Sequence, residues 1–139
     1  MKPILLLILT LTCFTAQADN TAREREQAIA KNNVWHAAKL RGVSFRAIGQ
    51  EPPWLLEISN GKEILLVTKY GKKKTAYPYV EPKLNQQQRR TVYSVTEQKF
   101  EVVIEGKACS DIMSGEKFSV SVFITLNDTQ LKGCGRALH

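Results

Sequence analysis

The sequence is poor in residues that bind metals or carry redox chemistry. Its 139 residues contain two histidines, His36 and His139, and three widely spaced cysteines, Cys13, Cys109 and Cys134. A redox site normally needs a C-x-x-C pair, and a structural zinc site needs four closely grouped ligands. The sequence also lacks the G-x-S-x-G string of an α/β-hydrolase. We therefore expect no metal, no cofactor and no catalytic activity.

Long apolar runs are scarce, and the one that stands out lies at the N-terminus. Residues 3–12 are apolar, follow Lys2 and precede the small-residue string Ala16-Gln17-Ala18. This layout is typical of a secretory signal peptide, and ten residues fall short of the roughly 20 that a spanning helix needs. We predict that residues 1–18 are a cleaved leader and that the chain is exported to the periplasm. Two alternatives are an uncleaved anchor and lipidation at Cys13.

Export determines how the two remaining cysteines are interpreted. Cys109 and Cys134 are the only cysteines after the leader, and two cysteines in an oxidising compartment normally form a disulfide. Closing a loop of about 25 residues would stabilise the fold by about 3 kcal/mol on the chain-entropy argument.

Residues 19–42 have the composition of a helical arm. Asn20 or Thr21 is a suitable N-cap, and the glycine at position 42 is a suitable stop. The helix is polar, so we expect it to contact the rest of the protein through Trp35 and Leu40. Two adjacent asparagines in its middle leave two shorter helices or a frayed arm as alternatives.

Residues 43–139 change to the alternating pattern of β-strands. The pattern predicts seven or eight short antiparallel strands that form a small β-barrel or a sandwich, and we prefer the barrel because closure removes exposed edges. Pro78 places its strand at an edge or a bulge, and residues 81–89 and 109–116 are predicted loops. The predicted strands are 45–48, 54–59, 62–70, 75–80, 91–95, 100–105, 118–126 and 131–136.

Three strings together resemble a family of bacterial envelope proteins without an assigned activity, usually described as membrane proteins or lipoproteins. They run from Gly42 to Trp54 (GVSFRAIGQEPPW), from Cys109 to Gly115 (CSDIMSG) and from Lys132 to Leu138 (KGCGRAL). The resemblance covers about residues 42–138. It implies an exported envelope domain and brings no catalytic residues.

A second resemblance is to the barrel-type inhibitors of C-type lysozyme. Those proteins insert an S-G-x-x-Y loop and a lysine from a neighbouring loop into the lysozyme cleft. Here Ser114-Gly115-Glu116-Lys117-Phe118 is similar, with Phe in place of Tyr, and Lys132 is the candidate lysine. The alternative is an ordinary Ser-Gly turn that leads into a strand.

The net charge of +7 is concentrated in the middle of the chain. These cations are either the solvated tips of hairpins or a surface for an anionic envelope component such as lipopolysaccharide phosphates, anionic lipid or an acidic protein. Nucleic acid is not an expected partner in the periplasm. The basic residues are Lys69, Lys72, Lys73, Lys74, Lys83, Arg89 and Arg90.

The remaining candidate binding residues lie near the cysteines or the Pro-Pro string. Glu51 and Arg46 would form an ion pair at the barrel mouth, and Trp54 would belong to the core. Asp111 would accept hydrogen bonds from amides of its own loop, and Arg136 is a candidate partner for it.

These observations favour an exported binding module without catalytic activity. An inhibitor of C-type lysozyme that uses Ser114 and Lys132 is the alternative. A hydrolase built from Ser114, Asp111 and a histidine ranks third.

Overall fold

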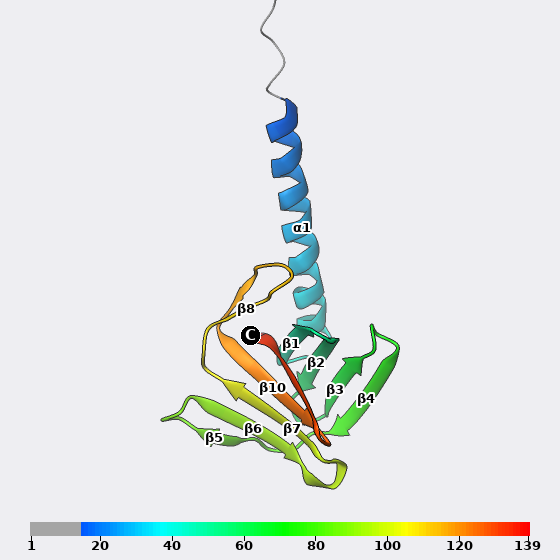
Figure 1. Cartoon of the computed structure of the whole chain (residues 1–139), viewed down its shortest axis with the longest axis vertical. Coiled ribbons are helices and arrows are strands. Elements are labelled where there is room, and N and C mark those ends of the chain that lie inside the picture. Colours follow the sequence, from blue (N-terminus) through cyan, green and yellow to red (C-terminus); the bar gives the residue numbers. More distant parts are fainter. Residues whose placement is uncertain (1–14) are drawn as a thin grey trace, which may run out of the picture. The chain divides into compact units, whose positions relative to one another are not determined.

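The computed structural model describes the backbone of residues 15–139 and the side chains from Asn20 onward, except Lys31 (Figure 1). Residues 1–14, with Cys13 and most of the predicted leader, lie outside the described residues. The fold is mainly β with an N-terminal helix, as predicted. The elements are α1 (Thr15–Leu40), β1 (Phe45–Gln50), β2 (Pro53–Ser59), β3 (Glu63–Thr68), β4 (Lys73–Pro78), β5 (Lys83–Asn85), β6 (Arg90–Val95), the 3-10 turn η1 (Thr96–Gln98), β7 (Phe100–Glu105), β8 (Cys109–Ser110), β9 (Lys117–Phe118), β10 (Val120–Leu126) and β11 (Thr129–Ala137).

The chain divides into two units, residues 1–34 and 35–139. In the first unit every described side chain is exposed to solvent. The second unit contains all buried side chains of the described residues. A chain that begins at residue 19 therefore retains the complete core.

Helix α1 is one continuous helix, so the predicted cap at Asn20 or Thr21 is wrong. The helix ends at the predicted glycine, where the Gly42 amide donates to the carbonyl of Lys39 at 2.9 Å with a φ of 89°. Trp35 is buried as predicted, but Leu40 is 75% exposed. Leu40 follows Trp35 by five residues, and side chains five apart point to different faces of an α-helix. Leu40 therefore cannot share the buried face of Trp35.

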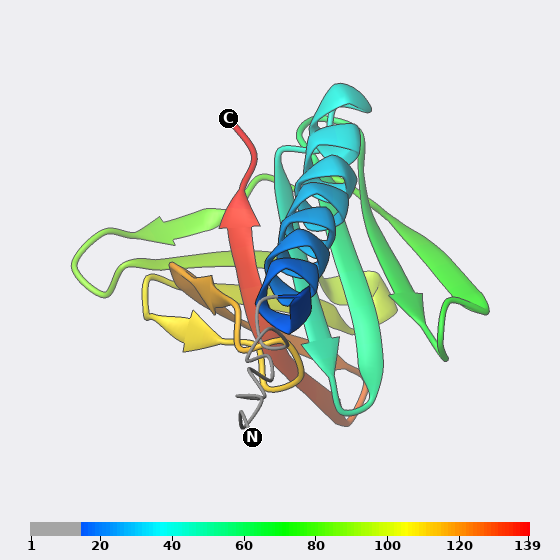
Figure 2. The same cartoon turned by 90° about the horizontal axis from the view of Figure 1, so that it is seen from above.

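Within residues 15–139, nine strands form one antiparallel sheet in the order β4-β3-β2-β1-β11-β10-β7-β6-β5. The sheet curls into a half-barrel (Figure 2). Strands β4 and β5 are its two edges and do not pair with each other, so the closure that favoured a barrel over a sandwich is incomplete. Lys73, Lys74 and Lys83 lie exposed on these edges, where charged side chains oppose pairing with another chain.

Residues 15–139 contain eleven strands, more than predicted, because β5 and β8 lack an apolar pattern and the predicted 118–126 strand is divided between β9 and β10. Strand β5 lies in the predicted 81–89 loop and pairs with β6 through backbone bonds alone. Strands β8 and β9 form a separate two-stranded ladder. The predicted 118–126 strand is also interrupted at Ser119, so that Phe118 packs in a different cluster from Val122 and Ile124.

The main core is formed by buried side chains of the strands of the half-barrel. It includes Trp54, as predicted, and a stacked pair, Tyr77 and Phe100, with ring centroids 3.7 Å apart. Burial raises the pKa of the Tyr77 phenol, and it also raises the pKa of Tyr93. A smaller cluster gathers Trp35, Phe118 and Cys134.

Candidate functional site

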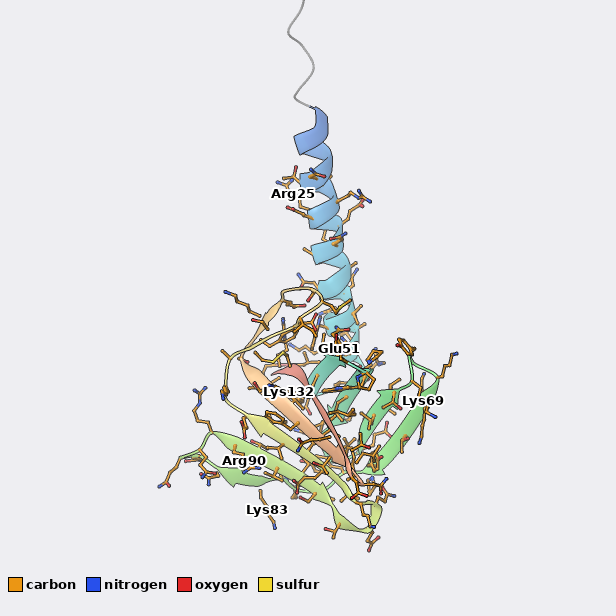
Figure 3. All side chains as sticks on the ribbon, in the orientation of Figure 1. Arg25, Glu51, Lys69, Lys83, Arg90 and Lys132 are labelled. Carbon is orange, nitrogen blue, oxygen red and sulfur yellow. A yellow bond between two sulfur atoms is a disulfide. The ribbon has the colours of Figure 1, made fainter. Side chains whose placement is uncertain are left out.

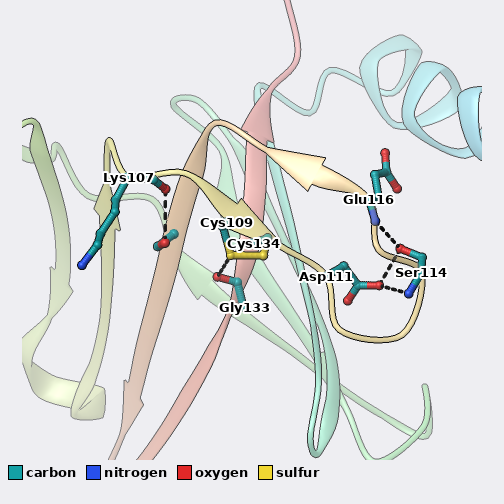
Figure 4. The surroundings of a disulfide bond; sticks show 8 residues. Lys107, Cys109, Asp111, Ser114, Glu116, Gly133 and Cys134 are labelled. Carbon is teal, nitrogen blue, oxygen red and sulfur yellow. Dashed lines mark hydrogen bonds between the residues drawn. A yellow bond between two sulfur atoms is a disulfide. The ribbon is translucent and has the colours of Figure 1, made fainter.

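A disulfide fixes the base of a loop near the C-terminal strand (Figure 4). Cys109 and Cys134 form the predicted bond, which spans 25 positions in sequence. Cys109 also pairs with Phe118 and Ser110 with Lys117 in the β8–β9 ladder. Residues 111–116 are thus closed at their base by covalent and backbone bonds.

Asp111 organises the interior of this loop. Its buried carboxylate accepts hydrogen bonds from the Ser114 amide at 2.9 Å and the Ser114 hydroxyl at 2.7 Å. Its backbone donates to the Glu116 carbonyl and accepts from the Gly115 amide, both at 2.8 Å. The prediction that Asp111 binds amides of its own loop is confirmed.

Arg136 holds the far side of the loop. It forms an ion pair with Glu116 at 2.5 Å. Its guanidinium also lies over two aromatic rings, 4.6 Å from the centroid of Phe118 and 4.7 Å from that of Trp35. The sequence had suggested Asp111 as its partner, and the ion pair with Glu116 falls in the same loop.

The tip of the loop is apolar and open to solvent. Ile112 is 71% exposed and Met113 is 74% exposed, and the neighbouring Ser114 and Gly115 are also exposed. A firmly held frame therefore presents two large apolar side chains to the outside.

A pocket of about 440 Å³ lies beside the loop. Three of the predicted binding residues, Glu51, Asp111 and Lys132, line it together. The Lys132 ammonium lies 5.7 Å from the ring centroid of Phe123, which also lines this pocket. Residues of all three strings that carry the envelope-family resemblance meet here, although they are far apart in sequence.

Two glycines in those strings make room for Trp54. A β-carbon at Gly49 would overlap the indole nitrogen of Trp54, and one at Gly133 would overlap the Ile48 carbonyl and the indole ring. Only glycine fits at such close approach. Trp54 lines a second pocket of about 340 Å³, which shares Gly49 and Ile48 with the first.

The ion pair expected between Arg46 and Glu51 is wrong. Among the described residues, Arg46 pairs with Glu57 at 3.2 Å, and Arg41 binds the same buried carboxylate at 2.9 Å. Burial lowers the pKa of Arg46, and the charge of Glu57 partly opposes this effect. The Arg46 guanidinium lies 4.7 Å from the ring centroid of Trp35.

Sequence reasoning missed Glu57, Arg41 and the contact of two arginines with the ring of Trp35. Glu57 stands directly opposite Arg46 in the β1–β2 register. An acid within an apolar strand, facing an arginine in the preceding strand, was the available signal. It becomes usable only once the register is known.

The basic residues separate into two groups (Figure 3). Lys69, Lys72, Lys73 and Lys74 belong to the β3–β4 hairpin, whereas Lys83, Arg89 and Arg90 belong to the β5–β6 hairpin. These hairpins occupy opposite ends of the strand order. The predicted single basic patch is thus two separate surfaces.

Comparison of the chain with known protein families, curated proteins and solved structures finds no match. Residues 15–139 contain no group of three or more acidic, histidine or cysteine side chains arranged to hold a metal ion. Over the same described range, no helix has the length and hydropathy of a membrane span.

Proposed function

We propose that this protein is an exported binding module of the bacterial cell envelope, without catalytic activity, that binds a protein partner through residues 111–116. The observation that carries the proposal is the exposed apolar pair Ile112 and Met113 on a loop held by a disulfide, an ion pair and the Asp111 hydrogen bonds. Export itself is inferred from the N-terminal sequence.

The fixed shape of this loop favours recognition of a partner with a complementary surface. A flexible loop loses conformational freedom on binding, and a loop already held in one conformation loses much less. Contiguous exposed apolar surface marks contact sites on soluble proteins, and Ile112 and Met113 are large, adjacent and exposed. The pocket beside the loop offers a recess for a side chain of the partner, with Lys132 and Glu51 at its wall.

Capture from an envelope extract tests this proposal. Residues 19–139 should capture a specific partner. The double variant Ile112→Ser/Met113→Ser should capture at least tenfold less of it. Leu84→Ser is the matched control, because Leu84 is a similarly exposed apolar residue, 68% accessible, on a different hairpin. Equal capture by the double variant and the wild type would refute a role for the loop.

A second candidate is inhibition of a C-type lysozyme. Two observations favour it: Ser114 is exposed on the loop, and Lys132 lines the pocket that Asp111 also lines. Lysozyme turnover should slow at micromolar protein, and Ser114→Ala and Lys132→Ala should each restore it in part. Unchanged turnover with the wild-type protein would remove this candidate and leave the first one standing.

A further inference from the structure

A second exposed apolar side chain lies in the turn between β3 and β4. Tyr70 is 83% exposed. Its backbone and those of its two neighbours are left-handed, with φ of 53° at Lys69, 56° at Tyr70 and 85° at Gly71. Left-handed backbone is unfavourable for residues with a side chain, so the turn holds Tyr70 in an unusual conformation at the surface.

The turn forms one wall of the 340 Å³ pocket. Tyr70 and Gly71 line it on one side, and Pro53, Leu55 and Val67 contribute apolar side chains. The buried Trp54 also lines it. Apart from Gln50, the side chains that line this pocket are apolar or aromatic, and the Tyr70 ring among them is exposed.

Four lysines lie in this turn and at the start of the strand that follows it. Lys69 and Lys72 lie in the turn, and Lys73 and Lys74 begin β4. All four are exposed, and none forms an ion pair within the described part of the chain. Four unneutralised positive charges beside an apolar pocket complement an amphiphile with a negative head and an apolar body.

We infer that the β3–β4 turn is a docking site for an anionic lipid bilayer. The lysines lie against lipid phosphates, Tyr70 enters the headgroup region, and the end of one acyl chain occupies the pocket beside Trp54. Tyrosine favours this interface because one end of its ring is apolar and the other polar. The inference does not depend on the function proposed for residues 111–116.

The β5–β6 hairpin provides an internal comparison. Lys83, Arg89 and Arg90 supply a similar charge there. Their hairpin lines neither of the two pockets described above. Binding that depends only on net charge would use both hairpins, whereas the inferred site uses one.

The test is co-sedimentation of residues 19–139 with two kinds of vesicle. One kind is phosphatidylcholine alone, and in the other about one lipid in three is phosphatidylglycerol. We expect binding only to the anionic vesicles. Each lysine near an anionic surface contributes about fivefold in affinity. The triple variant Lys69→Gln/Lys72→Gln/Lys73→Gln should therefore bind about 100-fold more weakly, and Lys83→Gln/Arg89→Gln/Arg90→Gln should change affinity less than about threefold. Tyr70→Ser should weaken binding about tenfold.

A quenching measurement tests the acyl chain in the pocket. The chain has two tryptophans, so Trp35→Phe leaves Trp54 as the only tryptophan, which can be excited selectively at wavelengths that tyrosine does not absorb. Brominated phosphatidylglycerol should quench Trp54, and soluble glycerol phosphate should neither bind nor quench. Equal losses in the two triple variants, tight binding of the soluble phosphate or an acidic peptide, or unquenched Trp54 on bound vesicles would overturn the inference.

Discussion

Residues 111–116 and the β3–β4 turn both expose apolar side chains beside a pocket, but they are held in different ways. The loop is fixed by the Cys109–Cys134 disulfide, the Arg136–Glu116 ion pair and the carboxylate of Asp111. The turn has one backbone hydrogen bond, from the Lys72 amide to the Lys69 carbonyl at 3.1 Å. One segment is thus held by side chains and a covalent bond, and the other by its backbone and the strands on either side.

The difference indicates what each segment recognises. A fixed loop with apolar residues at its tip is suited to a partner that itself has a defined shape, because little freedom is lost on contact. A cationic turn with one aromatic ring is suited to a charged surface without a defined shape, such as a bilayer. The experiments below separate the two segments, beginning with the largest expected effect.

Removing the disulfide should loosen the loop and leave the turn intact. We expect Cys109→Ser/Cys134→Ser to lower the free energy of unfolding by about 3 kcal/mol, because the unfolded chain regains the entropy of an open loop. Urea unfolding measures the loss, and capture of the partner should fall with it. Vesicle binding at low urea should not change. Reduced wild-type protein is the control and should behave like the variant; a loss of vesicle binding in either would show that the two segments are coupled.

Replacing Asp111 should have a smaller effect on the same loop. Asp111→Ala removes the buried carboxylate that accepts from the Ser114 amide and hydroxyl, and losing hydrogen bonds to a charged acceptor costs about 1.5–3 kcal/mol. Asp111→Asn keeps one acceptor oxygen and should cost less. Hydrogen exchange of the Ser114 amide should accelerate in both variants. Asp128→Ala, in the exposed turn between β10 and β11, is the matched control and should change stability by less than about 0.5 kcal/mol. An unchanged Ser114 exchange rate would show that Asp111 does not order the loop.

Alkaline pH should act on the other segment, through the strand that follows the turn. Tyr77 on β4 has a pKa raised by burial, while the unfolded chain releases that proton near pH 10. The stability linked to Tyr77 is therefore complete below about pH 10 and is lost as the pH rises toward the folded pKa. Urea midpoints should fall above this pH, and Tyr77→Phe should reduce the fall. If the urea midpoint falls with pH just as steeply in Tyr77→Phe/Tyr93→Phe, the loss of stability at alkaline pH comes from other groups.

The alternating pattern was a sound guide to the strands that bury one face, such as β2 and β7. It failed for β5, whose three residues are all exposed and pair with β6 through backbone atoms. It also overlooked the break at Ser119, because Phe118 continues the apolar alternation while turning to another cluster. Apolar spacing reports burial, and it does not distinguish which of two clusters receives the side chain.

The candidate site was predictable where residues close in sequence interact, as Asp111 and Ser114 do. The disulfide was predictable because only two cysteines follow the predicted leader. The pairs Arg46–Glu57 and Arg136–Glu116 join residues 11 and 20 positions apart. The β1–β2 register selects the first pair, and the path of the loop before β9 selects the second. Likewise, the division of the basic residues into two surfaces depends on the strand order, which places β4 and β5 at opposite edges.

The smallest effect, at Tyr70, gives the sharpest separation of stability from binding. Tyr70→Gly removes an unfavourable left-handed conformation of about 1–2 kcal/mol and makes the unfolded chain more flexible by about 0.4–1 kcal/mol. We expect a net stabilisation of about 0–1.6 kcal/mol in urea unfolding, together with weaker binding to anionic vesicles. Tyr70→Ser keeps a β-carbon and is the control: it should lose vesicle binding equally without becoming more stable. A Tyr70→Gly protein that is less stable than the wild type would mean that the ring contributes to packing, and the exposed aromatic would then belong to the fold.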